Sequence, residues 1–175
     1  MQNYSFLMSV YKKEKVEYLK LSIDSMLEQT IMPEQIVIVE DGELTESLSA
    51  LLDEYKNKYS DVFTLVKYKE NKGLGKALDI GMNYCRNDLI ARMDSDDISL
   101  KNRCERQLKL FEDDNTLSIV SGNIAEFKEN VENIVSIRTV PEYQDKIKKR
   151  MRTRSAFNHP AVMYKKSEVQ RCGGY

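Results

Sequence analysis

The hexapeptide from Arg92 to Asp97 (RMDSDD) contains the densest group of side chains that could do chemistry. Its three carboxylates lie within four residues and repel one another, and a divalent cation relieves that repulsion. Mg²⁺ and Mn²⁺ prefer hard oxygen ligands, commonly one or two carboxylates together with phosphate oxygens. The segment therefore predicts a metal site. The alternative is a solvated acidic turn in which Asp97 or Ser99 caps the following helix.

Two further polar groups follow strand-like sequence. Asp41 ends the β-branched run 36–39 and could accept a hydrogen bond from a nucleobase, with an Asx turn as the alternative. Segment 71–77 (NKGLGKA) departs from both common phosphate loops, because Leu78 stands where a dinucleotide loop has glycine and the Walker pattern is incomplete. Lys76 and the free N–H groups of this segment are a candidate contact for an anion or a nucleobase, and a tight turn is the alternative.

Two features lie in the last third of the chain. His159, the single histidine, precedes the apolar run 161–164, where it is either a ligand contact or a structural residue. The run from Lys146 to Arg154 (KIKKRMRTR) is strongly basic. It predicts either a solvated helical face or contact with an anionic membrane surface.

Alternating strands and helices must position these residues. Ligands bind at the carboxyl ends of the strands in a parallel α/β sheet, so we expect the segments after the first four strands to meet in one crevice. The alternation predicts an α/β fold with a Rossmann-like, mostly parallel sheet and helices on both faces. Hydrophobic periodicity predicts strands over 5–10, 35–39, 62–68, 88–93 and 117–121, helices over 14–29, 48–59, 74–85 and 100–113, and a hairpin over 124–139.

Composition narrows the functional classes. Lys and Arg number 27 against 28 Asp and Glu, a net charge of −1, which gives no basic footprint for nucleic acid. No apolar run approaches the roughly 18 residues that span a bilayer, and no signal-peptide pattern opens the chain. Three scattered cysteines without CxxC spacing argue against a disulfide framework or a thiolate metal site. We expect one cytoplasmic domain over residues 1–175. Peripheral contact with the inner face of a membrane is the functional interpretation of the basic run.

Taken in order, the motifs resemble those of family-two glycosyltransferases, the inverting nucleotide-sugar enzymes with a GT-A fold. They look most like the bacterial exopolysaccharide branch typified by amylovoran galactosyltransferases. The resemblance covers nearly the whole chain. Its motifs are MSVY at 8–11, IVEDG at 38–42, NKGLGKAL at 71–78, ARMDSDDIS at 91–99, NHPAVM at 158–163 and GGY at 173–175.

The resemblance implies a role for each matching residue. Bound Mg²⁺ or Mn²⁺ would neutralise the diphosphate leaving group. A carboxylate base would deprotonate the acceptor hydroxyl, which attacks with inversion. The implied nucleotide-binding residues are Ser9, Val10 and Tyr11 with Asp41 around a uracil base, Glu14 and Asp94 near the ribose, and Asn71 and Lys76. The implied metal ligands are Asp96 and Asp94, and His159 is an implied donor or acceptor contact.

The resemblance also places the acidic base shortly after a Gly-Gly-Tyr like residues 173–175. No residue here matches that base, so none is assigned and we expect it beyond Tyr175. The predicted function is metal-dependent transfer of a sugar from a nucleotide-diphosphate donor, a UDP-sugar, to a saccharide or lipid-linked acceptor in bacterial surface or exopolysaccharide synthesis. One alternative is a non-catalytic module that binds nucleotide-sugars or a partner. A Mg²⁺ phosphohydrolase is another, although Ser9 and Val10 stand where it needs an aspartyl nucleophile.

Overall fold

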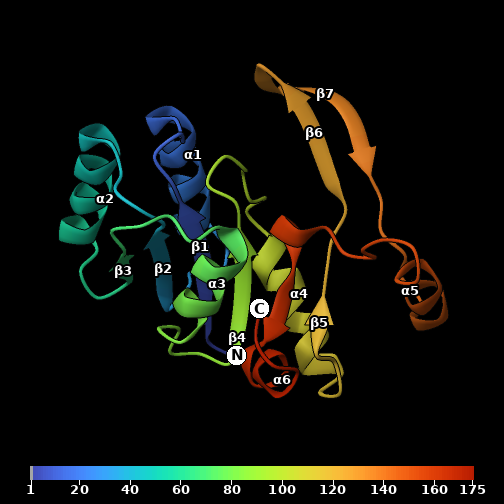
Figure 1. Cartoon of the computed structure of the whole chain (residues 1–175). Helices are drawn as coiled ribbons and strands as arrows, with labels where there is room; N and C mark the ends of the chain where they lie inside the picture. Colours follow the sequence, from blue (N-terminus) through green and yellow to red (C-terminus); the bar gives the residue numbers. More distant parts are fainter. Residues whose placement is uncertain (1) are drawn as a thin grey trace.

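Strands and helices alternate along the first two thirds of the chain, as predicted (Figure 1). The structure is a computed structural model that describes residues 2–175. The elements are β1 (Tyr4–Val10), α1 (Val16–Leu27), β2 (Gln35–Glu40), α2 (Glu46–Lys58), β3 (Phe63–Lys67), α3 (Leu74–Met82), β4 (Leu89–Met93), α4 (Arg103–Asp113), β5 (Ile119–Val120), β6 (Ile124–Lys128), β7 (Asn130–Arg138), α5 (Gln144–Arg150), the 3₁₀ turn η1 (His159–Ala161), β8 (Met163–Lys165) and α6 (Lys166–Arg171).

The main sheet has six strands in the order β3-β2-β1-β4-β8-β5. β1 pairs in parallel with β2 and β4, and β2 pairs in parallel with β3. β8 runs antiparallel to both of its neighbours, β4 and β5. The sheet is therefore mostly parallel, as predicted, with one reversed strand toward its far edge.

Helices cover both faces of this sheet, which also confirms the prediction. Successive strand residues point to opposite faces. On β1, Phe6 and Met8 lie in the core that α1, α2 and α4 close, whereas Leu7 lies in the core that α3 closes. All three side chains are fully buried. The near-continuous apolar sequence of β1 and β2 is thus explained by burial on both faces.

Within the apolar run 161–164, the strand β8 begins only at Met163. Pro160 lies in the preceding 3₁₀ turn. The carbonyl of Val162 accepts the backbone N–H of Arg92 at 2.9 Å and Nη2 of Arg103 at 3.1 Å. The strand predicted over 117–121 is also shorter and comprises only Ile119 and Val120.

The predicted hairpin is present as a separate two-stranded sheet, β6 and β7, which projects from the body of the molecule (Figure 1). The following helix α5 ends at Arg150, so the basic run continues beyond it in a turn. In the described part of the chain, no helix is both long and apolar enough to cross a bilayer.

We predict that Gly81→Ala lowers the free energy of unfolding by about 1–3 kcal/mol, the usual cost of overpacking. A Cβ atom at Gly81 would lie 2.5 Å from Cγ2 of Val39 and 2.6 Å from Cδ1 of Leu7. Urea denaturation measures the change. The control is Gly75→Ala in the same helix, where a Cβ meets open space and stability should hold or rise by up to about 1 kcal/mol. Equal losses in both variants would contradict this packing.

Candidate functional site

The segments that follow β1, β2, β3 and β4 meet at one edge of the sheet, as predicted. The backbone N–H of Asp41 donates to the carbonyl of Val10 at 2.8 Å, which joins the ends of β2 and β1. Ser95 donates its hydroxyl to Glu14, which joins the loop after β4 to the loop after β1. Ligand binding by these residues remains a prediction.

Asp41 holds the loop that follows β3. Its carboxylate accepts the backbone N–H of Lys72 at 2.7 Å and that of Gly73 at 3.0 Å, and its side chain is buried. The side-chain amide of Asn71 donates to the Asp41 carbonyl at 3.0 Å. A nucleobase N–H would have to share these carboxylate oxygens through their remaining lone pairs. Lys76 is exposed and pairs with Asp79 at 2.9 Å.

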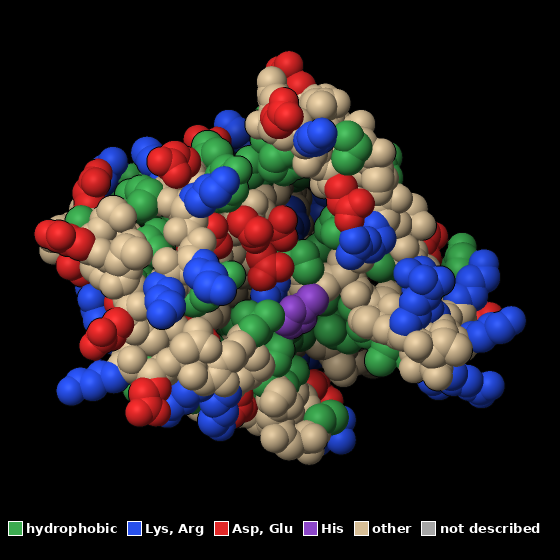
Figure 2. Space-filling model, turned by 45° about the horizontal axis from the view of Figure 1, so that its top comes forward, with side chains coloured by type: hydrophobic (Ala, Val, Ile, Leu, Met, Phe, Trp, Pro, Cys, Tyr) green, Lys and Arg blue, Asp and Glu red, His purple; other side chains and the backbone are tan. Residues whose placement is uncertain are grey.

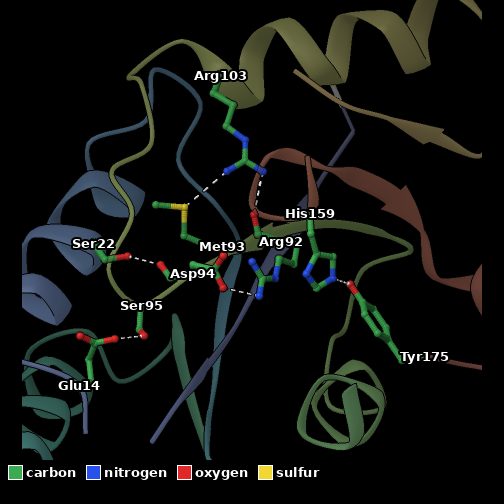
Figure 3. A network of polar contacts seen from close by, with 9 residues as sticks. All are labelled: Glu14, Ser22, Arg92, Met93, Asp94, Ser95, Arg103, His159 and Tyr175. Carbon is green, nitrogen blue, oxygen red and sulfur yellow. Dashed lines mark hydrogen bonds and ion pairs between the residues drawn. The ribbon is translucent and has the colours of Figure 1, made fainter. Parts of the chain in front are cut away.

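The acidic loop begins at a buried ion pair. Arg92 is completely buried in β4 and contacts the carboxylate of Asp94, which is about one-third exposed (Figure 3). Among the described residues, no atom accepts a hydrogen bond from Nε or Nη1 of Arg92. Buried donors without partners destabilise a fold, so this guanidinium is not explained by stability.

Helix α1 braces the same loop from the other side. Ser22 donates its hydroxyl to the backbone carbonyl of Asp94 at 2.8 Å, and Ser25 accepts the backbone N–H of Ser99 at 3.0 Å. These bonds fix the backbone of the loop at both of its ends. The carboxylates of Asp96 and Asp97 are left without ion pairs among the described residues.

The acidic side chains influence one another. Burial, together with the charges of Asp94 and Asp96, raises the pKa of Asp97 to about 6. Burial and the nearby carboxylates of Glu14 and Asp94 also raise the pKa of Asp96. A cation at this loop would relieve that repulsion.

The donor set fits Mg²⁺ or Mn²⁺ only in part. Across residues 2–175, no three His, Cys, Asp or Glu side chains converge as a ready-made metal site. Asp94 and Asp96 nevertheless supply hard carboxylate oxygens, and these ions are commonly held by one or two carboxylates plus phosphate oxygens. The residues therefore fit a metal that arrives with, or is completed by, a phosphate ligand.

His159 lies on the opposite side of Arg92 from the acidic loop (Figure 3). Its Nε2 is 2.8 Å from the hydroxyl of Tyr175, so the histidine is tied to the last residue of the chain. Burial and the positive charge of Arg92 lower the pKa of His159, which favours the neutral ring. Figure 2 shows the single histidine beside a group of acidic side chains in the middle of one face.

Two cavities of the described chain that border this edge are lined by residues outside the acidic loop. One, of about 260 Å³, is mostly apolar and is lined by residues including His159, Tyr164 and Tyr175. The other, of about 510 Å³, lies next to the Asp41 turn and includes Gly42 and Lys67. The acidic loop itself is open to solvent on its Asp96 side.

Sequence reasoning assigned no role to Arg92 or Tyr175. Arg92 was visible only as part of the acidic motif, although a charged residue inside an otherwise apolar strand (LIARM) was a usable signal. No local signal pairs Tyr175 with His159, because the two residues are distant in sequence and meet only through β8 and α6.

We predict that the two partners of the buried ion pair contribute unequally to stability. Asp94→Asn leaves the Arg92 charge buried and uncompensated, and should lower the free energy of unfolding by about 1–3 kcal/mol. Arg92→Met removes the unpartnered donors and leaves Asp94 partly solvated, so its effect should stay within about 1 kcal/mol. Urea denaturation of the two single variants and of the double variant tests this prediction. The double variant should recover most of the stability that Asp94→Asn loses. A larger loss for Arg92→Met would disprove it.

Comparison with known proteins places this geometry in a family. Residues 5–170 match Glycosyl transferase family 2. The fold is similar to that of a mannosyltransferase from Pyrobaculum calidifontis, PcManGT, solved in complex with GDP-Man and Mn²⁺. The TM-score is 0.71 at 16% identity, and the match covers 99% of this chain and 47% of that one. At such low identity the likeness shows the fold alone.

Two curated relatives are more similar in sequence. The chain is 38% identical over 174 residues to UDP-Gal:alpha-D-GlcNAc-diphosphoundecaprenol beta-1,3-galactosyltransferase of Escherichia coli, covering 98% of this chain and 62% of that protein. It is 34% identical over 172 residues to the amylovoran biosynthesis glycosyltransferase AmsE of Erwinia amylovora, covering 98% and 63%. The chain thus spans less than two thirds of the length of these relatives. From the family match and these relatives together, the chain belongs to glycosyl transferase family 2.

Proposed function

We propose that the protein forms the donor-binding part of an inverting glycosyltransferase of bacterial polysaccharide synthesis. The enzyme transfers a sugar from a UDP-sugar to a lipid-linked saccharide. The observation that carries this proposal is the meeting, at one sheet edge, of the loop held by Asp41 and the acidic loop held by Arg92. The E. coli relative supports the choice of substrates, since its name specifies a UDP-sugar donor and a diphosphoundecaprenol acceptor.

The nucleoside lies between the ends of β1 and β2 in this proposal. Ser9, Val10 and Tyr11 contact the base together with Asp41, and Glu14 and Asp94 lie near the ribose. The hydrogen bonds of Asp41 fix the 71–73 loop next to the end of β2, and Asn71 contacts the nucleotide from there. Lys76 must exchange its partner Asp79 for the nucleotide.

Asp96 would hold the metal, and Asp94 would assist from its place beside Arg92. A Mg²⁺ or Mn²⁺ ion held there would supply Lewis-acid stabilisation of the diphosphate leaving group. Arg92 keeps the Asp94 carboxylate in one orientation, and Ser22 holds the backbone below it. Preorganised charge of this kind lowers the barrier without rearrangement during the reaction.

Transfer breaks the bond between the anomeric carbon and the diphosphate oxygen and forms a bond to the acceptor hydroxyl. Attack from the opposite side inverts the anomeric centre, and the hydroxyl proton passes to a carboxylate base. None of residues 1–175 is assigned as that base, and we place it in a part of the full enzyme beyond Tyr175. His159 faces the same region and contacts the donor sugar or the acceptor.

A lipid-linked acceptor requires the site to work at a membrane surface. We place the protein in the cytoplasm at the inner face of the membrane. The three cysteines are free thiols, which fits a reducing compartment.

We predict that UDP binds to this protein in a metal-dependent manner. Titration calorimetry with Mn²⁺ present should give saturable binding, and omission of Mn²⁺ should weaken it at least about tenfold, because the diphosphate charge then meets the acidic loop uncompensated. Asp96→Ala should lose the metal effect.

The control for this titration is Asp113→Ala, which removes an exposed carboxylate at the end of α4. It should bind UDP as the unchanged protein does. UDP binding that is indifferent both to Mn²⁺ and to Asp96→Ala would refute the proposed metal role. Absence of binding for UDP, GDP and dTDP alike would refute the donor site and favour a partner-binding module.

A further inference from the structure

The β6–β7 hairpin has one polar face and one apolar face. On the polar face, Glu126 accepts a hydrogen bond from Ser136 at 2.7 Å and forms an ion pair with Arg138. Directly opposed residues of an antiparallel pair share a face, and neighbours along a strand alternate. Phe127 follows Glu126 and is opposed to Ile134, so this pair lies on the other face. The alternation along β7 is broken between Ile134 and Ser136 by a β-bulge, which adds one residue to that strand.

The apolar side of the hairpin is not covered by any element of the described chain. β7 is exposed along its whole length. Ile134, Val135 and Ile137 are 48%, 59% and 67% exposed, although such side chains are normally buried. Contiguous exposed apolar surface of this kind marks a contact with a protein or a membrane.

Helix α5 and its flanks add positive charge to the same part of the molecule. Residues 142–154 contain six Lys and Arg against two acidic residues, and α5 buries none of its side chains. Two more large apolar side chains, Tyr143 and Met151, flank the helix and are 62% and 52% exposed. Cations interleaved with exposed aromatic and apolar side chains are typical of surfaces that lie on anionic lipid.

These two features border the candidate site. In Figure 1 the hairpin and α5 extend from the same side of the sheet, and one short segment of chain connects them. Figure 2 shows the acidic group and the histidine in the middle of the face, with the hairpin above them and a gathering of Lys and Arg at the right-hand rim. Asn158, next to His159, bonds to the carbonyls of Gly122 and Arg138 at the base of the hairpin.

We propose that the apolar face of β6–β7, together with the basic segment 142–154, is a docking surface for an anionic lipid bilayer. The apolar side chains enter the headgroup region, and the cations contact lipid phosphates. The proposal rests on the proposed function, because a lipid-linked acceptor must reach a site beside this surface. It goes beyond that function by naming the residues that bring the site to the membrane.

The charge of the surface favours a bilayer over a second copy of the chain. A twofold contact between copies places the same patch against itself. The interface would then contain two identical basic segments, and their like charges would repel. An anionic bilayer complements this charge, and each Lys or Arg near such a surface strengthens binding about fivefold.

Vesicle co-sedimentation tests the proposal directly. The unchanged protein should bind vesicles of phosphatidylcholine with phosphatidylglycerol and should not bind phosphatidylcholine alone. Reversal of three cations, in the variant Lys148→Glu/Lys149→Glu/Arg152→Glu, should weaken binding by more than about a hundredfold, because loss of the three cations alone accounts for that factor. The hairpin variant Ile134→Ser/Ile137→Ser, which keeps all cations, should also lose vesicle binding.

Matched variants elsewhere on the molecule test whether vesicle binding depends on this surface or only on net charge and exposed apolar area. Lys58→Glu/Arg106→Glu/Lys109→Glu reverses three exposed cations on α2 and α4, and Leu21→Ser/Leu110→Ser removes two exposed leucines. Both should bind vesicles as the unchanged protein does. Equal losses in these controls, or full binding by the hairpin variant, would overturn the proposal.

Two further outcomes are informative. Absence of vesicle binding, combined with a dimer that the hairpin variant dissociates in sedimentation velocity, would assign the surface to a second copy and overturn the proposal. Calorimetric titration of UDP on the same variants should show unchanged nucleotide binding. If the proposed donor site is wrong, UDP binding fails in calorimetry while vesicle binding is unaffected, because vesicle binding needs no nucleotide.

Discussion

The parallel pairing of β1 with β2 and β4 is the constraint on which the site depends. Val10 lies opposite Glu40, and Met8 lies opposite Met93, so Asp41 and Asp94 leave the sheet at the same edge. A slip of β4 by one residue would reverse its side chains, and Arg92 would point into the other core. The buried apolar residues of both faces exclude that slip. Packing of the core thus sets the geometry of polar groups that contribute little to the core themselves.

Burial of Arg92 is unfavourable for folding and is better explained by the candidate site. Its guanidinium is buried with donors that find no acceptor in the described chain, an arrangement that an apolar residue of similar size would avoid. It lies between Asp94 and His159, which come from different elements and face the same region (Figure 3). Local rules of folding are commonly broken at functional sites. The buried charge contacts the first carboxylate of the acidic loop, and burial together with this charge lowers the pKa of His159.

The near-zero net charge conceals a separation of charge. The acidic loop lies at the sheet edge, whereas segment 142–154 is strongly basic. Screening limits the reach of exposed charges to about 8–10 Å, so each region would act on its own proposed ligand. An anionic surface beside the site and a cation within it are therefore compatible. The whole-chain charge balance predicts no nucleic-acid partner, whereas the proposed ligands follow from the local distribution of charge.

The sequence by itself determined the alternation of strands and helices, the mostly parallel sheet, the hairpin and the acidic loop, because these follow from local periodicity and composition. The family motifs also lie in local segments such as 71–78 and 91–99. Only the tertiary structure decided that β8 runs antiparallel to its neighbours. It also decided where β8 starts, directly after Val162, whose carbonyl accepts hydrogen bonds from Arg92 and Arg103. It also decided that the Asp41 carboxylate holds the 71–73 loop and that Arg92 pairs with Asp94 from inside the sheet. These contacts join residues that are distant in sequence, or depend on which face a side chain takes, and neither property is encoded in any local pattern.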